Sequence, residues 1–286
     1  MSYLLVLLAV VLLAFEFAFS KAYQIAQGVS LEAGLRFNGW NGLFTAVIFF
    51  CLCGFRVKFS LFSLLMAVGL SLCSTLYSLL GFRVLKSGNM ALYSVFMMSG
   101  GMVLPYVFGI LFLEEPLTLA RLVGLAVILA AVLLSNGAKS LGGKKQLALC
   151  LAVFVLNGFV SILSKCHQIA TDLRPVDSTA FVLYAAVSRC VLSFGVLLCK
   201  KGSPMPAQPK GKVLTLVSGA ALIGGLSYLL QLVGARDLPA SVLYPLITGG
   251  SILFSTLSGM VFFKERPRKK QLLGILACLL GTLFFL

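Results

Sequence analysis

The chain has 286 residues, of which 60% are hydrophobic and 11% charged, and its mean hydropathy is +1.05. This composition excludes a water-soluble globular protein and indicates a chain that crosses a membrane many times. The formal net charge of +15 does not indicate a nucleic-acid partner, because the Lys and Arg residues are spread over successive loops instead of clustering on one face.

Ten apolar runs follow one another along the chain, each close to the length of about 20 residues that a helix needs to span a bilayer. We expect spans near residues 3–27, 33–53, 60–84, 89–112, 118–138, 146–170, 178–199, 212–234, 241–263 and 269–286. Alternation with period two is absent from these runs. The predicted fold class is therefore an all-α membrane protein with ten transmembrane helices.

The first run contains a carboxylate, Glu16, about 20 Å along the helix from Tyr3. A carboxylate at this depth of the bilayer costs a few kcal/mol unless it faces a cavity or a partner. We predict that Glu16 binds a cationic group or exchanges a proton there. The alternative is a structural ion pair with Arg189 or Lys165, the two basic residues that also lie within spans.

Two segments recur at about half the length of the chain. Ser20–Ala26 (SKAYQIA) returns as Ser164–Ala170 (SKCHQIA), 144 residues later, and Gly109–Glu115 matches Gly259–Glu265 at an offset of 150. Self-similarity at this period indicates two copies of one unit.

The predicted units are residues 1–140 and 141–286, with five spans each. An odd number of spans makes the second unit enter the membrane upside down relative to the first. The chain is therefore predicted to be an inverted repeat, an arrangement that allows two halves to open a central site to either side in turn.

The repeat also carries a family resemblance, through Gly234–Ser241, Leu243–Pro245, Phe263–Glu265 and Gly274 in the second half and Glu115–Thr118 and Gly124 in the first. These segments resemble the ten-helix EamA-type form of the drug/metabolite transporter superfamily. The chain is also similar to the four-helix small multidrug resistance proteins, whose first-helix glutamate binds protons or cationic substrate. Glu16 matches that glutamate, but its counterpart in the second half is Val160, with Asn157 the nearest polar residue.

Several further residues are candidates for the substrate site, because they are polar or aromatic and fall at similar levels of the predicted spans. They are Tyr77, Tyr93, Asn157, Tyr228, Gln231, Tyr244 and Arg189. The tyrosines could enclose an ammonium group through cation–π attraction, worth about 0.5–2 kcal/mol each, or they could simply pack at the membrane interface or in the core. The stripes of polar side chains could equally serve as hydrogen-bonding contacts between helices.

Arg189 lies midway along its span and needs a counter-charge. It could bind a substrate carboxylate while Glu16 holds an amine, or it could form a structural pair. Pro105 and Pro245, each near a Gly-Gly pair, are expected to interrupt two helices and serve gating, with close packing of the glycines as the alternative. Glu115, followed by a proline, is expected at the start of a helix.

The predicted function is secondary active transport of a small organic amine, cationic or zwitterionic, with proton coupling through Glu16. The alternative is an antiporter for an anionic metabolite that uses Arg189, Lys165 and Lys21 as ligands. The sequence has neither a nucleotide-binding domain nor the residue constellations of an enzyme, and the eight cysteines have no metal-ligand spacing. The expected partners are the substrate and the lipid bilayer, as a monomer or homodimer, with no cofactor, metal or nucleic acid.

The loops differ in charge on the two sides of the predicted membrane. Five Lys and Arg residues fall on the side of the termini and sixteen on the opposite side. The protein is predicted to lie in the inner (plasma) membrane, and by the positive-inside rule both of its termini are predicted to lie outside the cytoplasm.

Overall fold

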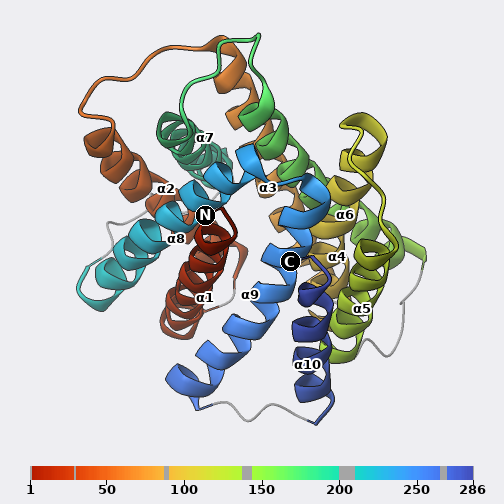
Figure 1. Ribbon diagram of the computed structural model, residues 1–286. Coiled ribbons are helices and arrows are strands. Elements are labelled where there is room, and N and C mark those ends of the chain that lie inside the picture. Colours follow the sequence, from red (N-terminus) through yellow and green to blue (C-terminus); the bar gives the residue numbers. More distant parts are fainter. Residues whose placement is uncertain are drawn as a thin grey trace.

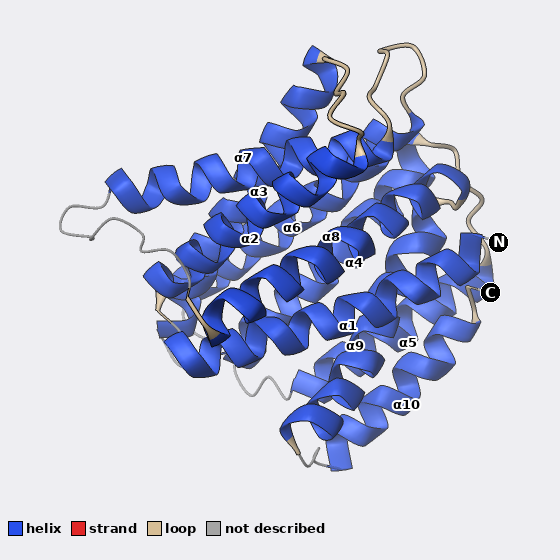
Figure 2. Ribbon diagram, turned by 90° about the vertical axis from the view of Figure 1, so that its left-hand side faces the viewer, coloured by secondary structure: helices blue, strands red, loops and turns tan. Residues whose placement is uncertain are grey.

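The computed structural model describes residues 2–28, 30–86, 90–136, 144–199, 210–264 and 269–285. These residues form ten helices: α1 (Ser2–Gln27), α2 (Leu31–Leu52), α3 (Leu61–Lys86), α4 (Met90–Phe112), α5 (Leu119–Asn136), α6 (Lys144–Ile169), α7 (Ser178–Cys199), α8 (Lys212–Asp237), α9 (Ala240–Phe263) and α10 (Lys269–Leu283) (Figure 1). The two termini lie at the same end of the bundle (Figure 2), as an even number of spans requires. The all-α membrane fold predicted from composition is confirmed.

Eight of the ten described helices are long and apolar enough to cross a bilayer, and in α5 and α10 the apolar stretches, Leu119–Leu133 and Leu272–Leu283, are shorter. Helices suit this environment because they satisfy every backbone group internally where lipid offers no hydrogen-bond partner. The outer surface carries exposed apolar side chains, including Leu4 at 70% and Leu119 at 78% exposure. In a membrane, these side chains face lipid.

Short polar side chains fix where the helices begin. The Ser30 side chain accepts a hydrogen bond from the backbone N–H of Ala33 at the start of α2. In the other half, the Asp177 carboxylate accepts from the N–H groups of Thr179 and Ala180 at the start of α7. Such caps satisfy N–H groups that the helix itself leaves free.

The two halves of the chain pack through exchanged partners. The first helix of each half contacts the third and fourth helices of the other, so that α1 packs against α8 and α9 and α6 packs against α3 and α4. The remaining contacts include the pairs α2 with α7, α5 with α10 and α4 with α9. Helices far apart in the sequence therefore pack side by side.

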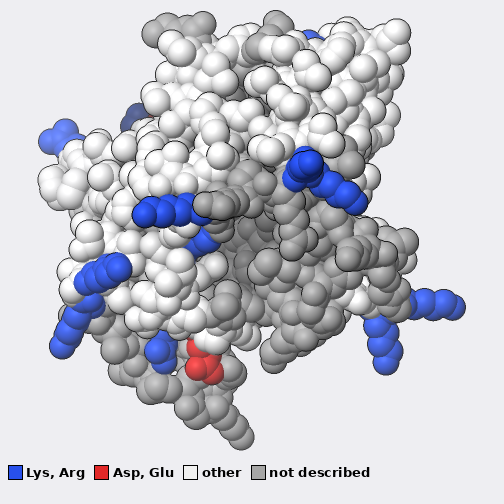
Figure 3. Space-filling view, turned by 90° about the horizontal axis from the view of Figure 1, so that it is seen from below, with Lys and Arg blue, Asp and Glu red and all other residues white. Residues whose placement is uncertain are grey.

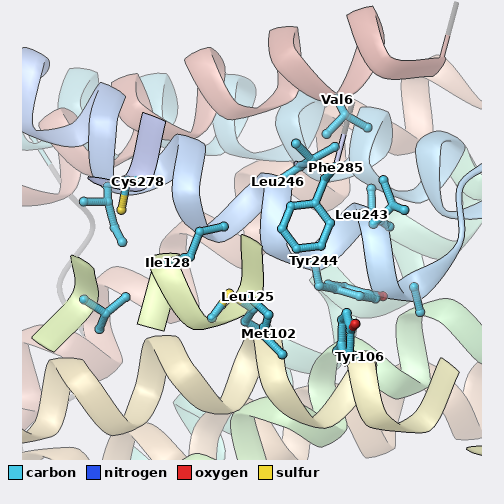
Figure 4. Close-up of a cluster of buried hydrophobic side chains, with 14 of the residues drawn as sticks. Val6, Met102, Tyr106, Leu125, Ile128, Leu243, Tyr244, Leu246, Cys278 and Phe285 are labelled. Carbon is cyan, nitrogen blue, oxygen red and sulfur yellow. The ribbon is translucent and has the colours of Figure 1, made fainter. Parts of the chain in front are cut away.

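Two large hydrophobic clusters hold this arrangement. One joins α4, α5, α9 and α10 with Val6 of α1, and Figure 4 shows Tyr244 beside Tyr106 within it. The other joins α2, α3, α7 and α8, with Phe49 and Phe181 fully buried. The face of the molecule seen from below carries several separate Lys and Arg side chains, with acidic side chains visible in its lower part (Figure 3).

α4 and α9 are continuous through Pro105 and Pro245, so the expected interruption of these helices does not occur. A proline removes the N–H that would bond the carbonyl four residues earlier. In α4 that carbonyl belongs to Gly101, and it accepts a hydrogen bond from the Ser161 hydroxyl of α6 instead (3.2 Å). A neighbouring helix thus replaces the bond that proline removes.

The glycines beside these prolines are in close contact with other helices. A Cβ at Gly101 would lie 2.6 Å from Nδ2 of Asn157, and a Cβ at Gly250 would lie 2.8 Å from the Val10 side chain. Close packing therefore accounts for these glycines in this conformation.

Candidate functional site

Glu16 lies on the side of α1 that packs against α8. A Cβ at Gly224 of α8 would come within 2.6 and 2.7 Å of its two carboxylate oxygens, so the carboxylate rests against the α8 backbone. Two turns earlier in α1, the carbonyl of Ala9 accepts a hydrogen bond from Ser227 of α8 (2.7 Å). The flanking Phe15 and Phe17 are exposed on the outer surface. The half-buried carboxylate therefore lies between helices, as a charged group at bilayer depth requires.

Arg189 of α7 lies close enough to Glu16 for an electrostatic interaction. Its hydrogen bond, however, goes to a different residue: Nη1 donates to Oδ1 of Asn41 on α2 (3.4 Å). The two helices meet backbone to backbone here, since a Cβ at Gly42 would lie 2.8 Å from the Ala186 carbonyl oxygen. A fixed positive group and a negative group thus face the same region from α7 and α1.

Two tyrosines share that region. Tyr77 of α3 interacts electrostatically with both Arg189 and Glu16. Tyr228 of α8 also interacts with Arg189, and its hydroxyl is hydrogen-bonded to the Ser164 hydroxyl of α6 (2.9 Å). Six helices, namely α1, α2, α3, α6, α7 and α8, therefore contribute polar or charged groups to this region.

The other two predicted tyrosines lie next to this group. Tyr93 of α4 interacts with Tyr77, and its ring contacts Gly81 of α3 so closely that a Cβ there would overlap it. Tyr244 of α9 is buried near Tyr228, and its hydroxyl donates to the Ser161 carbonyl of α6. Both tyrosines join helices at the edge of the region around Glu16 and Arg189.

Asn157 and Gln231 have hydrogen-bond partners on the protein itself. Nδ2 of Asn157 donates to the Met97 carbonyl of α4 (2.7 Å). Nε2 of Gln231 donates to the Ser227 hydroxyl (3.1 Å), which in turn bonds α1. In this conformation the Asn157 amide connects α6 to α4, whereas the Gln231 amide bonds within α8 to the serine that contacts α1.

A second charged cluster surrounds the turn between α8 and α9. Nζ of Lys165 is buried and donates to the carbonyls of Ala235 and Leu238, each at 2.7 Å. The Glu115 carboxylate accepts from the N–H groups of Ala240 (2.6 Å) and Ser241 (2.8 Å). Glu115 therefore caps the start of α9 and not of the adjacent α5. The expected role at the start of a helix is confirmed, but the helix is a different one.

Two residues of the candidate site, Asn41 and Gly224, were not predicted from the sequence. Asn41 is a polar residue within an apolar run, a signal that was available, whereas nothing in the sequence singles out Gly224. Glycines are frequent in membrane helices, and only packing shows which one contacts a functional side chain.

Comparison with known proteins identifies the family of this fold. The model of the EamA-like transporter family matches residues 144–286, half of the chain. The chain belongs to the EamA-like transporter family. This family is a multi-span membrane fold of transporters, and the chain is accordingly a membrane transporter embedded in a lipid bilayer that moves a small molecule.

A solved crystal structure resembles this EamA-like transporter with a TM-score of 0.79, over 99% of this chain and 95% of that chain. The two sequences are 15% identical, so the likeness concerns the fold alone. No curated protein matches the sequence.

Proposed function

We propose that this transporter carries a small organic amine, cationic or zwitterionic, at the site between Glu16 and Arg189. The observation that carries the proposal is the placement of these opposite charges: the Glu16 carboxylate rests against the α8 backbone at Gly224, Arg189 is hydrogen-bonded to the buried Asn41 of α2, and the two charges lie near each other. A carboxylate at bilayer depth suits an ammonium group, and an aromatic ring beside it adds cation–π attraction.

The geometry favours an amine over the anionic alternative. An anion site would need free basic groups, but Lys165 already donates to two backbone carbonyls. Lys21 lies with Nζ 4.7 Å from the centre of the Phe263 ring, a cation–π contact. Arg189, the third of the proposed anion ligands, lies near the carboxylate of Glu16, and a region with one group of each charge suits an amine or a zwitterion better than a phosphorylated anion.

Transport in this proposal is secondary active and alternates between the two sides. Residues 1–140 and 141–286 form the two inverted units, and their rocking exposes the site to each side in turn. Two repeat-related positions at the ends of α4 and α9, Glu114 and Lys264, both have positive φ angles (54° and 53°), which supports two copies of one unit. Glu16 couples the cycle by binding a proton or the amine. Pro105 and Pro245 lie where gating movements act.

We also propose an inner (plasma) membrane location with both termini outside the cytoplasm, because the side opposite the termini carries most of the basic residues.

Four other predicted site residues bond or pack against groups of the protein in this conformation, and in the proposal they support the site: Asn157, Gln231, Tyr93 and Tyr244.

The test is uptake of labelled amines and amino acids into proteoliposomes, with counterflow against sugar phosphates and nucleotide sugars. Glu16→Gln keeps the size of the side chain and removes its charge, so coupled uptake of the amine should fall to background. Glu114→Gln, a substitution in an exposed turn, is the matched control and should keep wild-type uptake. Unchanged amine uptake by Glu16→Gln, or counterflow with phosphorylated anions alone, contradicts the proposal.

A further inference from the structure

Asn41 of α2 is a deeply buried polar side chain beside the proposed site. Only 3% of its surface is exposed, and Oδ1 accepts the hydrogen bond from Arg189. Its amide nitrogen Nδ2 is also buried and has no hydrogen-bond partner among the described residues. Buried amide groups are normally paired, so this free donor calls for an explanation.

The orientation of the amide is fixed by chemistry. A guanidinium group only donates hydrogen bonds, so the atom of Asn41 that faces Arg189 must be the oxygen. The NH₂ group is then the unpaired end. This NH₂ group is buried, and the next residue, Gly42, packs directly against the backbone of α7 at Ala186 and Cys190.

The free donor lies next to the Arg189 hydrogen bond, since the oxygen and nitrogen of an amide are bonded to the same carbon. Ser193, one helical turn beyond Arg189 in α7, has a buried hydroxyl that likewise has no hydrogen-bond partner in the described part of the chain. The α2–α7 contact therefore holds a positive charge and spare donors together, while the negative charge of Glu16 lies against α8 and near enough to Arg189 for an electrostatic interaction.

We infer that Arg189 and Asn41 form a carboxylate subsite, and that the substrate is a zwitterion whose ammonium group faces Glu16. This inference rests on the proposed function and narrows its substrate class. Arg189 contacts the carboxylate. Asn41 positions the guanidinium through Oδ1, and its spare N–H group donates to the same carboxylate when the substrate is held. Charged acceptors of this kind make the strongest hydrogen bonds with such donors.

The experiment compares α-amino acids with their carboxamides, which keep the amine and the size but lack the negative charge. The probes are alanine, leucine and phenylalanine with alaninamide, leucinamide and phenylalaninamide, tested for uptake into proteoliposomes. The wild type should favour at least one acid over its amide by about tenfold or more, as expected for loss of one charged hydrogen-bonded contact. Asn41→Asp places a carboxylate against Arg189 and should bring the ratio close to one.

Asn41→Leu is a second variant of similar size that only removes the hydrogen bonds. It should raise the KM of the acid and leave the KM of the amide unchanged. The control is Thr45→Val, one turn further along α2, which removes a hydrogen bond to the Ala221 carbonyl of α8 (3.3 Å) without touching Arg189. It should keep the wild-type ratio.

The outcomes separate this inference from the proposed function. If wild-type protein takes up the amides as well as the acids, or if folded Asn41 variants keep the wild-type ratio, the carboxylate subsite is refuted while amine transport stands. If wild-type protein takes up neither acids nor amines, both are refuted.

Discussion

Glu115 gives the sharpest prediction for stability, because its carboxylate joins the loop after α4 to the start of α9. It accepts hydrogen bonds from the N–H groups of Ala240 (2.6 Å) and Ser241 (2.8 Å), 125 and 126 residues further along the chain. A hydrogen bond to a charged group contributes about 1.5–3 kcal/mol. The negative charge at the positive end of α9 adds about 0.3–1 kcal/mol.

Glu115→Gln keeps one acceptor oxygen but removes the charge and turns an NH₂ group towards a backbone N–H. Glu115 is half-buried, so water replaces part of the lost interaction. We therefore expect the free energy of unfolding to fall by about 1.5–3 kcal/mol, the contribution of roughly one charged hydrogen bond. The neighbouring Glu114→Gln, in an exposed position, should change it by less than about 0.5 kcal/mol.

The assay is unfolding of the purified protein by SDS in mixed micelles, followed by far-ultraviolet circular dichroism. The reaction of the fully buried thiols of Cys150 and Cys278 with a thiol-specific dye gives an independent measure of opening. Both should report the same loss for Glu115→Gln. Equal stability of the two glutamine variants would refute the reasoning that Glu115 anchors α9.

Two further substitutions test contacts at the centre of the bundle. Ser161→Ala should lower the free energy of unfolding by about 1–2 kcal/mol, because it removes the hydroxyl that bonds the Gly101 carbonyl, which Pro105 has already deprived of its helix bond. In a Pro105→Ala background the backbone N–H returns, so the same substitution should change the free energy of unfolding very little. A double-mutant cycle of unfolding measures this difference. Gly224→Ala adds a Cβ that displaces the Glu16 carboxylate, so substrate affinity in a binding titration should fall roughly 10- to 100-fold. The protein should lose little stability, because the displaced group is the end of a flexible side chain and can move.

For each of the two substitutions, one result would contradict the prediction. Equal costs of the serine substitution with and without proline would show that the Ser161 hydroxyl does not replace the missing helix bond. For the glycine substitution, Gly195→Ala is the control, since a Cβ there meets nothing within 4 Å. If both alanine variants bind substrate like the wild type, the close contact at Gly224 does not shape the site.

The membrane fold is predictable from the sequence because the bilayer imposes it locally. Each apolar run of sufficient length must become a helix to satisfy its own backbone, whatever its neighbours are. The same local cost singled out Glu16 and Arg189, since a charged side chain within such a run is expensive wherever the helix is placed. Fold class and the two central charges were therefore determined by the sequence alone.

Which helices pack against one another was decided only by the tertiary structure. Lipid is as apolar as the helix surface, so contacts in a membrane depend on shape and on individual hydrogen bonds that a one-dimensional pattern does not encode. Nothing in the chain order indicates that Gly224 contacts Glu16, that Asn41 holds Arg189, or that Glu115 caps a helix more than a hundred residues away. The first two of those contacts bring the separate charges of α1 and α7 against neighbouring helices and so define the candidate site, because contact between helices depends on packing in three dimensions.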